Sequence, residues 1–508
     1  MTSYEDAQAA VIGFLKNPAS HGIGEAVEVI TTHSAHVFLA GDRAYKIKRA
    51  VKYNYLDFTG LETRRKIIRR ELELNAPGAP MIYDRVVAIT REATGELTFG
   101  GSGEAVEYAL AMHRFAREDE LDRIAEAGGL CVGIAEGLGI AVAELHANAA
   151  QRDADGAALI GEILDELAEA FEGMVEVLGA VRIAAFNEGA RARSAETAPL
   201  LAARSQNGFV RRCHGDLHLK NIVMIEGRPI LFDALEFDER LGTTDVFYDL
   251  AFLLMDLWHR GLPQQANAAL TRYLTETEDF GGLGALPLFL AVRAAIRAMV
   301  AVQAMSDRAA DGLARDARAY LDQAIAFLAP PSARLLAIGG VSGSGKTTIA
   351  AHLAPNLGPN PGAVHLRSDL ERKAMFGVDP LKPLPQEAYR PEVSREVYAR
   401  MLARAEAILA SGHGAILDAT FISLEDRHAA EALARAQGVR FDGLWLSADP
   451  AILEARVAAR KGDASDADVA VLRAQLARAP EAGNWVAIEA GGAPELVAAR
   501  ASAVLGLG

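Results

Sequence analysis

The chain has 508 residues, 51% of them hydrophobic and 23% charged, so it can bury two or three cores and has a globular composition. Its two cysteines, Cys131 and Cys213, exclude a cysteine-rich zinc site or a disulfide framework and fit a reducing compartment, the cytoplasm. The net charge of −15 lies mostly in the first 330 residues, because residues 331–508 carry 19 Lys+Arg against 20 Asp+Glu, which argues against a broad nucleic-acid-binding face.

Strand and helix patterns alternate in the first 115 residues. The N-terminus, MTSYEDAQAA, lacks the basic and apolar regions of a signal peptide. β-branched and aromatic residues on both sides of a Gly-Asp pair predict a hairpin over 28–48. Apolar residues at helical spacing predict a helix over 61–75, and the apolar run at 105–115 predicts a strand.

Helices are expected over most of 118–328. Residues 118–205 are rich in Ala, Leu and Glu, with breaks expected at Gly128-Gly129 and around Gly137 and Gly139. Two short apolar strands are expected at 221–225 and 229–235, before the helical pattern returns over 245–328.

The most apolar long stretch, residues 286–305, predicts a packed amphipathic helix. It contains Arg293 and Arg297, which a bilayer would penalise, so we expect no membrane span there. Pro330-Pro331 then marks a linker.

After this linker the pattern alternates between strands and helices. Strands are expected at 334–340, 363–369, 414–420 and 439–448, each followed by a helical stretch. This alternation predicts a parallel sheet that is covered on both faces, as in doubly wound α/β domains.

A phosphate-binding loop follows the first of these strands. Residues 340–347 fit the pattern G-x-x-x-x-G-K-[ST] at every fixed position. We expect backbone N–H groups of this loop and of the following helix start to bind the phosphates of ATP. Lys346 can reach the β- and γ-phosphates, and the Thr347 hydroxyl can ligate Mg²⁺. The ATP-binding residues predicted here are Gly340, Val341, Ser342, Gly343, Ser344, Gly345, Lys346, Thr347 and Thr348.

Two carboxylates end the next two strands. Asp369 can accept the proton of an acceptor hydroxyl as a catalytic base, although an aspartate before LERK also suits a helix N-cap. Asp418 can hold Mg²⁺ or its water shell, and a cap at the strand end is the alternative.

Arg456 and Arg460 are four residues apart, which places both on one face of a predicted helix. A polar loop, GDASDAD, follows them. We expect a lid whose guanidinium groups close over the transferring phosphate, with a solvated charged face as the alternative.

The order of these motifs over residues 334–480 resembles the small P-loop kinases of the zeta-toxin, chloramphenicol phosphotransferase and polynucleotide-kinase-like group. The shared features are the P-loop, R-S-D-x-x-R/K, a strand ending in D-A-T, and R-x-x-x-R before S-D-A. The resemblance implies a kinase but names no acceptor.

A second catalytic pattern lies at 213–223, CHGDLHLKNIV. His214, Asp216 and Asn221 have the spacing H-x-D-x-x-x-x-N, in which the Asp serves as catalytic base and the Asn ligates Mg²⁺. Asp233 follows twelve residues later in ILFDALEF, where a second Mg²⁺ carboxylate is expected. We expect His214 to brace the turn and Cys213 to be a buried apolar residue.

Residues 25–325 resemble the aminoglycoside-phosphotransferase-like branch of the kinase superfamily, on the evidence of HGDLHLKNIV, LFDALEF and DVFYDLAFL. The resemblance implies that Lys46 holds the ATP phosphates and that Glu71 pairs with it, with Lys48 and Glu62 as rivals. It also implies a structural role for Asp249. Residues 108–113 would form the hinge that contacts adenine. The loop at 31–37 lacks the glycines of a protein-kinase phosphate loop.

The sequence therefore predicts a multi-domain fold. A bilobal α+β kinase-like domain is expected over 1–328, with a small lobe at about 25–115 and a helical lobe at about 116–328. An α/β doubly wound P-loop NTPase domain is expected over 333–508, folding separately.

Both domains are expected to use ATP and Mg²⁺ to phosphorylate a hydroxyl of a small-molecule acceptor in the cytoplasm, with no membrane partner. In the alternative, the N-terminal domain senses a ligand and only the P-loop domain is a kinase, which could act on a nucleotide or nucleic-acid 5′-hydroxyl. The sequence fixes neither the acceptors nor an oligomeric state.

Overall fold

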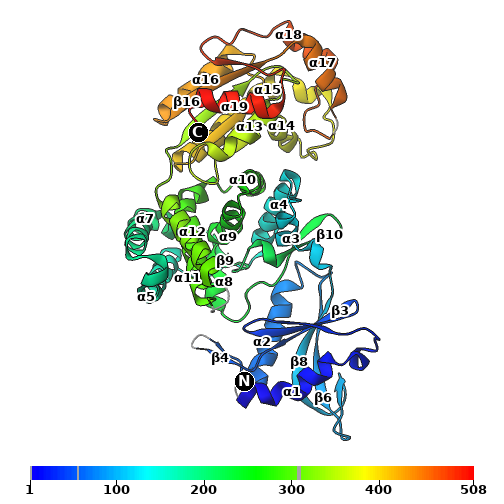
Figure 1. Cartoon of the computed structure of the whole chain (residues 1–508). Helices are drawn as coiled ribbons and strands as arrows, with labels where there is room; N and C mark the ends of the chain where they lie inside the picture. Colours follow the sequence, from blue (N-terminus) through cyan, green and yellow to red (C-terminus); the bar gives the residue numbers. More distant parts are fainter. Residues whose placement is uncertain (1–2, 54–55, 306–309, 461, 508) are drawn as a thin grey trace. The chain divides into compact units, whose positions relative to one another are not determined.

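The structure is a computed structural model that describes all residues except 1–2, 54–55, 306–309, 461 and 508 (Figure 1). Its contacts divide the chain into two units. The first unit holds residues 1–134, 144–154 and 208–249, and the second holds 135–143, 155–207 and 250–508. Helices that precede Pro330-Pro331 thus share a unit with the P-loop, and separate folding on either side of these prolines stays a prediction.

The first unit is built on an antiparallel six-stranded sheet. The predicted hairpin over 28–48 is confirmed, with Gly41 in the left-handed region (φ 61°) at the turn between its second and third strands. In spatial order the strands are β1 (Glu28–Thr31), β2 (Ala35–Ala40), β3 (Arg43–Lys48), β8 (Glu104–His113), β6 (Tyr83–Arg91) and β7 (Leu97–Phe99).

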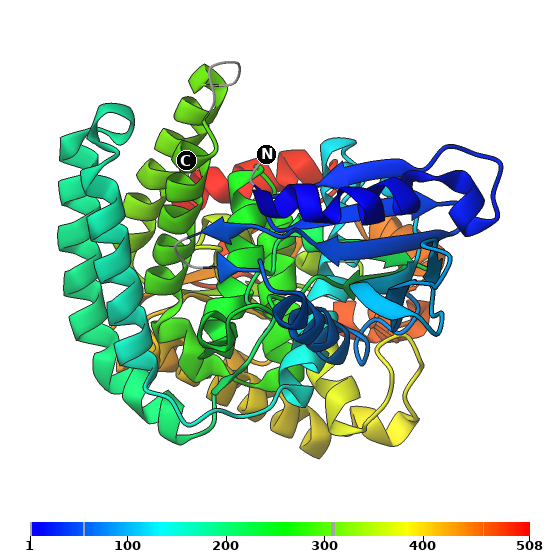
Figure 2. The same ribbon diagram turned by 90° about the horizontal axis from the view of Figure 1, so that it is seen from below.

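Two helices cover the two faces of this sheet, as Figure 2 shows for the first of them. Side chains of α1 (Ser3–Lys16) pack with Phe38 and Ile47, whereas Ile68 of α2 (Leu61–Asn75) packs with Ala44 and Leu110. Successive strand residues point to opposite faces, so β3 can hold an apolar residue against α1 and a lysine toward α2.

Short elements complete the first unit. The strand predicted at 229–235 ends earlier, at Leu231, because the chain turns at Asp233 with a φ of 60°. These elements are η1 (Pro18–His21), β4 (Lys52–Tyr53), β5 (Leu56–Asp57), η2 (Arg117–Asp119), α3 (Leu121–Glu126), β9 (Val210–Arg212), η3 (Leu219–Asn221), β10 (Ile222–Ile225), β11 (Arg228–Leu231), α8 (Glu239–Gly242) and β12 (Thr243–Asp245).

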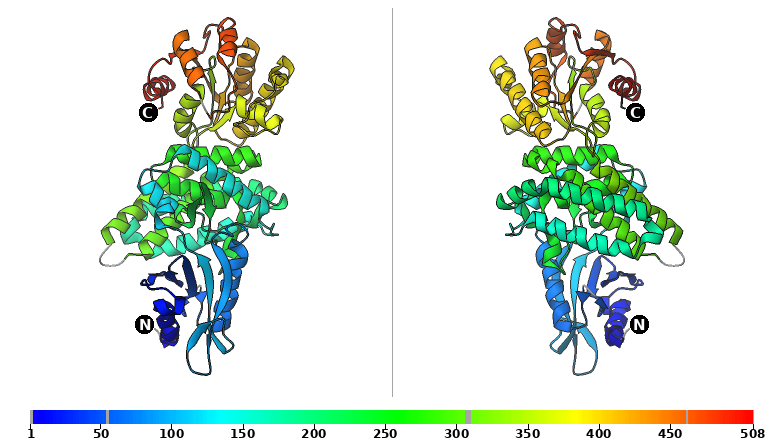
Figure 3. Two further views of the ribbon diagram at one scale, coloured as in Figure 1. Left: turned by 90° about the vertical axis from the view of Figure 1, so that its right-hand side faces the viewer. Right: turned by 90° about the vertical axis from the view of Figure 1, so that its left-hand side faces the viewer.

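Long helices make up the part of the second unit that precedes the linker, and Figure 3 shows several of them side by side. The break predicted at Gly128-Gly129 is confirmed, but the break around Gly137 and Gly139 is wrong, because both lie inside α4. The helices here are α5 (Gly156–Glu172), α6 (Val175–Leu178), α7 (Ala180–Gln206), α10 (Pro263–Thr277), η4 (Phe280–Gly284), α11 (Leu286–Gln303) and α12 (Ala310–Leu328), while α4 (Val132–Asn148) and α9 (Val246–His259) cross between units.

Helix α11 is long and apolar enough to cross a membrane by length and composition, but 67% of its most apolar window is buried inside the protein. Arg293 lies buried on this helix, with its guanidinium 4.7 Å from the centre of the Phe252 ring. Both observations agree with the predicted packed helix.

A five-stranded parallel sheet follows the linker, in the order β14 (Val364–Arg367), β15 (Ala415–Asp418), β13 (Arg334–Gly339), β16 (Arg440–Ser447) and β17 (Val486–Glu489). The first four strands confirm the prediction, and β17 was missed because VAIE is short and largely exposed. The accompanying helices are α13 (Lys346–Leu353), η5 (Ala354–Asn356), α14 (Ser368–Met375), η6 (Gln386–Tyr389), α15 (Pro391–Ala410), α16 (Leu424–Ala436), α17 (Pro450–Ala459), α18 (Val469–Leu476) and α19 (Pro494–Leu505).

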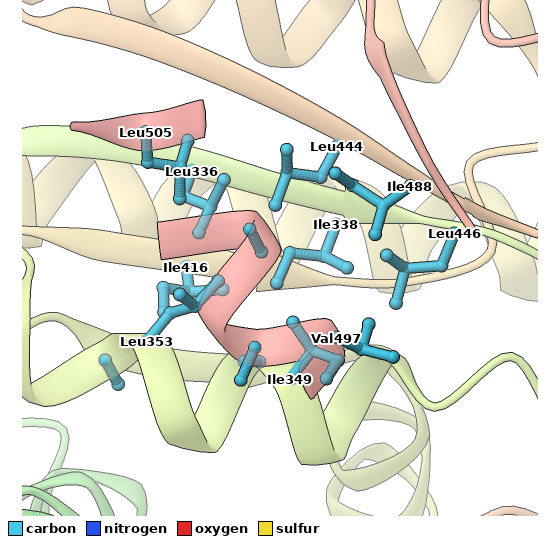
Figure 4. Packing of buried hydrophobic residues seen from close by; sticks show 14 of the residues in the cluster. Leu336, Ile338, Ile349, Leu353, Ile416, Leu444, Leu446, Ile488, Val497 and Leu505 are labelled. Carbon is cyan, nitrogen blue, oxygen red and sulfur yellow. The ribbon is translucent and has the colours of Figure 1, made fainter. Parts of the chain in front are cut away.

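The core beneath this sheet fixes where the P-loop lies. Figure 4 shows Ile338 of β13 with Ile349 of α13 and Val497 of α19. Because the strand before the loop and the helix after it are both anchored in this core, the loop between them is held at the carboxyl edge of the sheet.

We predict that Gly139→Ala destabilises the protein, since a Cβ there would lie 2.5 Å from the carbonyl oxygen of Ala269 and 2.9 Å from the Tyr273 nitrogen, both in α10. The expected loss is about 1–3 kcal/mol of unfolding free energy. Gly161→Ala in α5 is the control, because nothing lies within 4 Å of its Cβ position, and it should be neutral or stabilising. Equal effects of the two substitutions in thermal or urea unfolding would contradict the close approach of α4 and α10.

Candidate active sites

A buried ion-pair network in the first unit joins the sheet to α2. Lys46 Nζ lies 2.6 Å from Glu71 Oε1, as the resemblance implied, and 2.6 Å from Asp233 Oδ1. Lys48, the rival lysine, lies 2.6 Å from the other Glu71 oxygen and 2.6 Å from Glu236. Glu71 therefore forms an ion pair with each of the two lysines.

Burial lowers the pKa of Lys46, but the attraction of Asp233 and Glu71 outweighs it, so this pKa lies well above the ordinary value. Lys46 is therefore a fixed cation at physiological pH. The other rival, Glu62, lies on the exposed side of α2 and pairs with Arg65 instead.

The Asp216 loop and the Asp233 turn are each held by side-chain contacts. Asn221 donates its amide N–H to the backbone and side-chain oxygens of Asp216, both at 2.9 Å, which leaves its Oδ1 as the atom suited to a cation. Tyr83 accepts a hydrogen bond from the Asp233 N–H at 3.0 Å. The structure thus brings Asp216 and Asn221 into contact, and Asp233 into contact with Lys46.

His214 and Asp249 brace the loop, as predicted for both. Two oxygens of buried Asp249 accept the backbone N–H groups of His214 and Gly215, at 3.1 and 2.8 Å. His214 Nε2 donates to the carbonyl of Phe232 at 2.9 Å, and burial lowers its pKa. A neutral imidazole with a backbone partner acts here as a structural link between the two loops.

A cavity of about 260 Å³ lies over this network. Lys46, Asn221 and Asp233 line its polar side, and Val37 and Phe232 contribute to its apolar side. This combination of an apolar wall with a few convergent polar groups is typical of a nucleotide pocket.

The predicted hinge, residues 108–113, overlaps one wall of this cavity. Residues 108–113 belong to β8, and the cavity wall runs from Met112 to Phe115. The backbone N–H groups of His113 and Arg114 bind the carbonyl groups of Ile82 and Asp42. Met112 and His113 thus belong both to the predicted hinge and to the cavity wall, and the adenine contact stays a prediction.

A second charge cluster ties the Asp233 segment to α2. Glu239, which is about half-exposed, pairs with Arg70 at 3.0 Å, Arg152 at 2.7 Å and Arg212 at 3.2 Å. Burial raises the pKa of Glu239, but the hydrogen bonds and charges of the arginines outweigh this and lower it to about 2. Arg70 precedes Glu71, so this cluster supports the same helix as the buried network.

The P-loop of the second unit has the expected backbone. Gly340 has a φ of 143°, and a Cβ there would lie 2.5 Å from the Leu446 carbonyl oxygen. Lys346 opens α13 and donates to the Val341 carbonyl at 3.1 Å. Gln475 of α18 accepts the Ser342 N–H at 2.7 Å, a contact that no local motif predicts because it spans 133 residues.

Three strand ends meet at this loop. The Thr347 hydroxyl donates to Asp418 Oδ2 at 2.7 Å, and the same oxygen lies 3.1 Å from His365 Nε2. Burial raises the pKa of Asp418, but the hydrogen bond and charge of His365 and the charge of Lys346 lower it to about 2. Asp369 has a raised pKa, because burial outweighs the attraction of Lys346, and this suits a proton acceptor.

Arg456 does not lie where the lid prediction put it. Its guanidinium donates to the carbonyl groups of Ala490, Gly491 and Gly492 after β17. The prediction fails because α17 ends at Ala459, so that Arg460 leaves the helix and the two arginines do not share a face.

Arg460 lies close enough to the P-loop for its charge to act on Lys346. Burial is the largest cause that lowers the pKa of Lys346, and the attraction of Asp418 and Asp369 opposes it. The positive charge of Arg460 lowers this pKa further. Its Nε lies 3.8 Å from Asp463, and its buried Nη1 has no hydrogen-bond partner among the described residues. Of the two arginines, Arg460 alone remains a candidate to contact phosphate.

The polar GDASDAD loop is anchored to the helix that carries Asp369. Lys373 lies 2.7 Å from Asp466, and Tyr389 donates to the same carboxylate at 2.5 Å. Arg367, at the end of β14, pairs with Asp463 at 3.1 Å. The RSD and SDA motifs were recognised in the sequence, but their mutual contacts depend on the fold.

Comparison with protein families supports both halves of the prediction. Residues 96–286 match the model of the phosphotransferase enzyme family, and residues 335–482 match the model of an AAA domain. The chain joins a phosphotransferase-family segment to a P-loop segment. It is a kinase-type phosphotransferase, and the predicted fold classes and resemblances are confirmed.

Relatives of similar length exist in mycobacteria. The uncharacterized proteins Rv2004c of Mycobacterium tuberculosis and Mb2027c of Mycobacterium bovis are each 29% identical over 460 residues, which is 89% of this chain and 90% of the relative.

Two solved structures match part of the chain. A gluconokinase from Sinorhizobium meliloti covers 35% of this chain and 92% of its own, with 20% identity and a TM-score of 0.25. A choline/ethanolamine kinase family protein from Mesorhizobium loti covers 62% and 97%, with 16% identity and a TM-score of 0.37.

We predict that the Glu239 ion pairs add an acid-sensitive part to stability. Since the folded pKa of about 2 lies below the ordinary value of 4.5, this contribution is present above pH 4.5 and is lost as the pH falls toward 2. The unfolding free energies of wild type and Glu239→Gln should differ at pH 6 and converge toward pH 3. A difference that stays constant with pH would show that Glu239 acts through packing instead.

Proposed function

We propose that this phosphotransferase has two ATP sites in one cytoplasmic chain, each transferring the γ-phosphate to a hydroxyl of a small molecule. The observation that carries the proposal is that each unit gathers a lysine, a candidate base and oxygen ligands. In the first unit these are Lys46, the half-exposed Asp216, and Asn221 with Asp233.

In this first site, Lys46 would hold the ATP phosphates while Glu71 fixes the position of its ammonium group. Asp216 would orient the acceptor hydroxyl and take its proton as the phosphate is transferred. Its side chain, 42% exposed, is accessible to such an acceptor.

In the second site, Lys346 and the P-loop amides would bind the phosphates, and Asp369 would serve as the base. Arg460 would stabilise charge on the transferring group. The acceptor for either site remains a proposal at the level of a hydroxyl-bearing small molecule.

The donor sets of both sites fit Mg²⁺, which prefers oxygen ligands. Asn221 and Asp233 would hold it in the first site, and Thr347 and Asp418 in the second. When bound, Mg²⁺ neutralises charge on the β- and γ-phosphates.

The main alternative makes the first segment a sensor without catalysis. Its ion-paired Lys46, its Asp216–Asn221 contact and its cavity favour an active site over a degenerate one. A ligand-sensing role would not require a catalytic base such as the Asp216 carboxylate.

We predict that Asp216→Asn abolishes transfer by the first site and nearly spares ATP binding, because the base acts on the acceptor. Lys346→Ala should instead weaken nucleotide binding and turnover at the second site, because the lysine contacts phosphate. Coupled ATPase assays with sugars, amino sugars, nucleosides and aminoglycosides, run on wild type and both variants, would assign each activity to a segment.

Two results would contradict these roles. ATP affinity that falls in step with the rate in Asp216→Asn would make this residue structural. An activity that both variants retain in full would belong to neither proposed site.

We predict that Arg460→Ala lowers turnover at the second site by roughly 10²–10³-fold, with a smaller effect on ATP affinity. Arg456→Ala is the matched control from the same helix region, and it should lower stability while its kcat stays near the wild-type value. Equal losses of kcat in the two variants would contradict the separation of these arginines.

A further inference from the structure

Helix α10 lies against the edge of the P-loop sheet. Strand β14 ends the strand order, so the backbone on its outer side faces away from β15. The amide of Asn267 donates to the Ala363 carbonyl at 2.9 Å in a buried contact. The His365 N–H donates to the Thr271 hydroxyl at 3.4 Å. Ala363 and His365 are two residues apart, so their backbone groups point to the same side.

The side chain of His365 continues this contact into the P-loop site. The main-chain N–H of His365 binds Thr271, and the imidazole of the same residue lies 3.1 Å from Asp418. Asp418 in turn accepts a hydrogen bond from the hydroxyl of Thr347. A chain of hydrogen bonds therefore runs from α10 through the edge strand to both candidate Mg²⁺ ligands.

A second connection leaves the end of α10. Glu278 caps this helix and pairs with Arg404 of α15. Arg404 also lies 2.9 Å from Glu371, which is 4% exposed and follows Asp369 by two residues on α14. The same helix end thus supports the element that carries the candidate base.

We propose that α10, an element of the phosphotransferase-family segment, is a built-in part of the P-loop site. It closes the β14 edge, which keeps His365 in place as a positioning residue for Asp418. Nucleotide handling by the P-loop segment then depends on Asn267 and Thr271, which lie outside that segment. The dependence of nucleotide handling on α10 rests on the proposed roles of Thr347 and Asp418. The contact between α10 and the β14 edge is observed independently of those roles.

The sequences on either side of this contact explain why it is specific. An open strand edge exposes backbone groups that can pair with another chain, so proteins cover such edges. Polar side chains at two positions one helical turn apart, Asn267 and Thr271, match two backbone groups two residues apart on a strand. A purely apolar helix face would cover this edge without satisfying those groups.

Hydrogen exchange of the full-length protein tests the proposal without requiring turnover. Protection of residues 340–348 by ATP is measured while Mg²⁺ is titrated, so that the reading belongs to the P-loop alone. The variants are Asn267→Ala and Thr271→Val, each with a neighbour on the same helix as control: exposed Gln264→Ala, and Thr275→Val, whose hydroxyl binds within the helix.

We expect Asn267→Ala and Thr271→Val to raise the Mg²⁺ concentration for half-protection by about three- to tenfold, and to speed exchange at 363–367. Substitution of the positioning residue itself, His365→Phe, should raise the Mg²⁺ concentration for half-protection by about 10–100-fold, the range for residues that orient metal ligands. His365→Gln keeps a donor and should recover part of this loss, while the controls should match wild type.

Faster exchange at 363–367 with an unchanged Mg²⁺ midpoint would overturn the proposal, because α10 would then cover the edge without positioning the site. Unchanged exchange and midpoint would overturn it as well. If ATP fails to protect residues 340–348 in wild type, both this proposal and the proposed ATP site of the P-loop are contradicted. Protection that responds as expected in a chain without phosphotransfer would support the inference and contradict the proposed reaction.

Discussion

A buried lysine ammonium group within reach of carboxylate charge is the interaction common to both candidate sites. A polyanionic nucleotide needs cations, and the carboxylates proposed as base and metal ligands would otherwise repel it. Lys46 and Lys346 supply that charge, but their pKa values shift in opposite directions. Lys46 is held by Glu71 and Asp233 at 2.6 Å, which outweighs its burial. Lys346 donates to a backbone carbonyl, so burial dominates and its pKa is lowered.

This difference shapes what each site requires from the rest of the chain. The first site depends on long-range ion pairs, because Glu71 must reach two lysines of β3 while Asp233 and Glu236 come from a distant segment. The Glu239 cluster belongs to the same arrangement, since it ties α2 to that segment. The second site depends on backbone: its loop is fixed between a strand and a helix whose side chains share one core. Substitutions in the core under the parallel sheet should therefore disturb the second site, whereas the first site should respond mainly to the loss of its ion pairs.

Local patterns in the sequence were enough to predict both candidate sites. The P-loop, the H-x-D-x-x-x-x-N spacing and the strand before Asp418 each depend on residues close together in the chain, and each appears where expected. Arg456 shows where such reasoning stops: spacing four assumes a helix, and the helix ends one residue before Arg460. Gly139 shows the same limit, because a glycine that permits close contact with α10 looks like a helix break in the sequence alone. Contacts such as Lys48 with Glu236, or Asn267 with Ala363, join residues far apart in the chain and have no local signal.

The position of α10 also bears on why the phosphotransferase-family segment and the P-loop segment share one chain. A flexible tether would let either segment work alone, and the linker at Pro330-Pro331 favours that view when the sequence is considered by itself. The contacts of Asn267, Thr271 and Glu278 instead tie the helices before the linker to β14 and α15. Each of these contacts is weak alone, since one hydrogen bond contributes only about 0.5–1.5 kcal/mol and a surface ion pair about 0–1 kcal/mol. Together they act on one strand and one helix, those that carry His365 and Asp369. An element that contacts the supports of two candidate site carboxylates, Asp418 and Asp369, could couple the segments without any large change of shape, because hydrogen-bonded and packed groups shift between discrete arrangements.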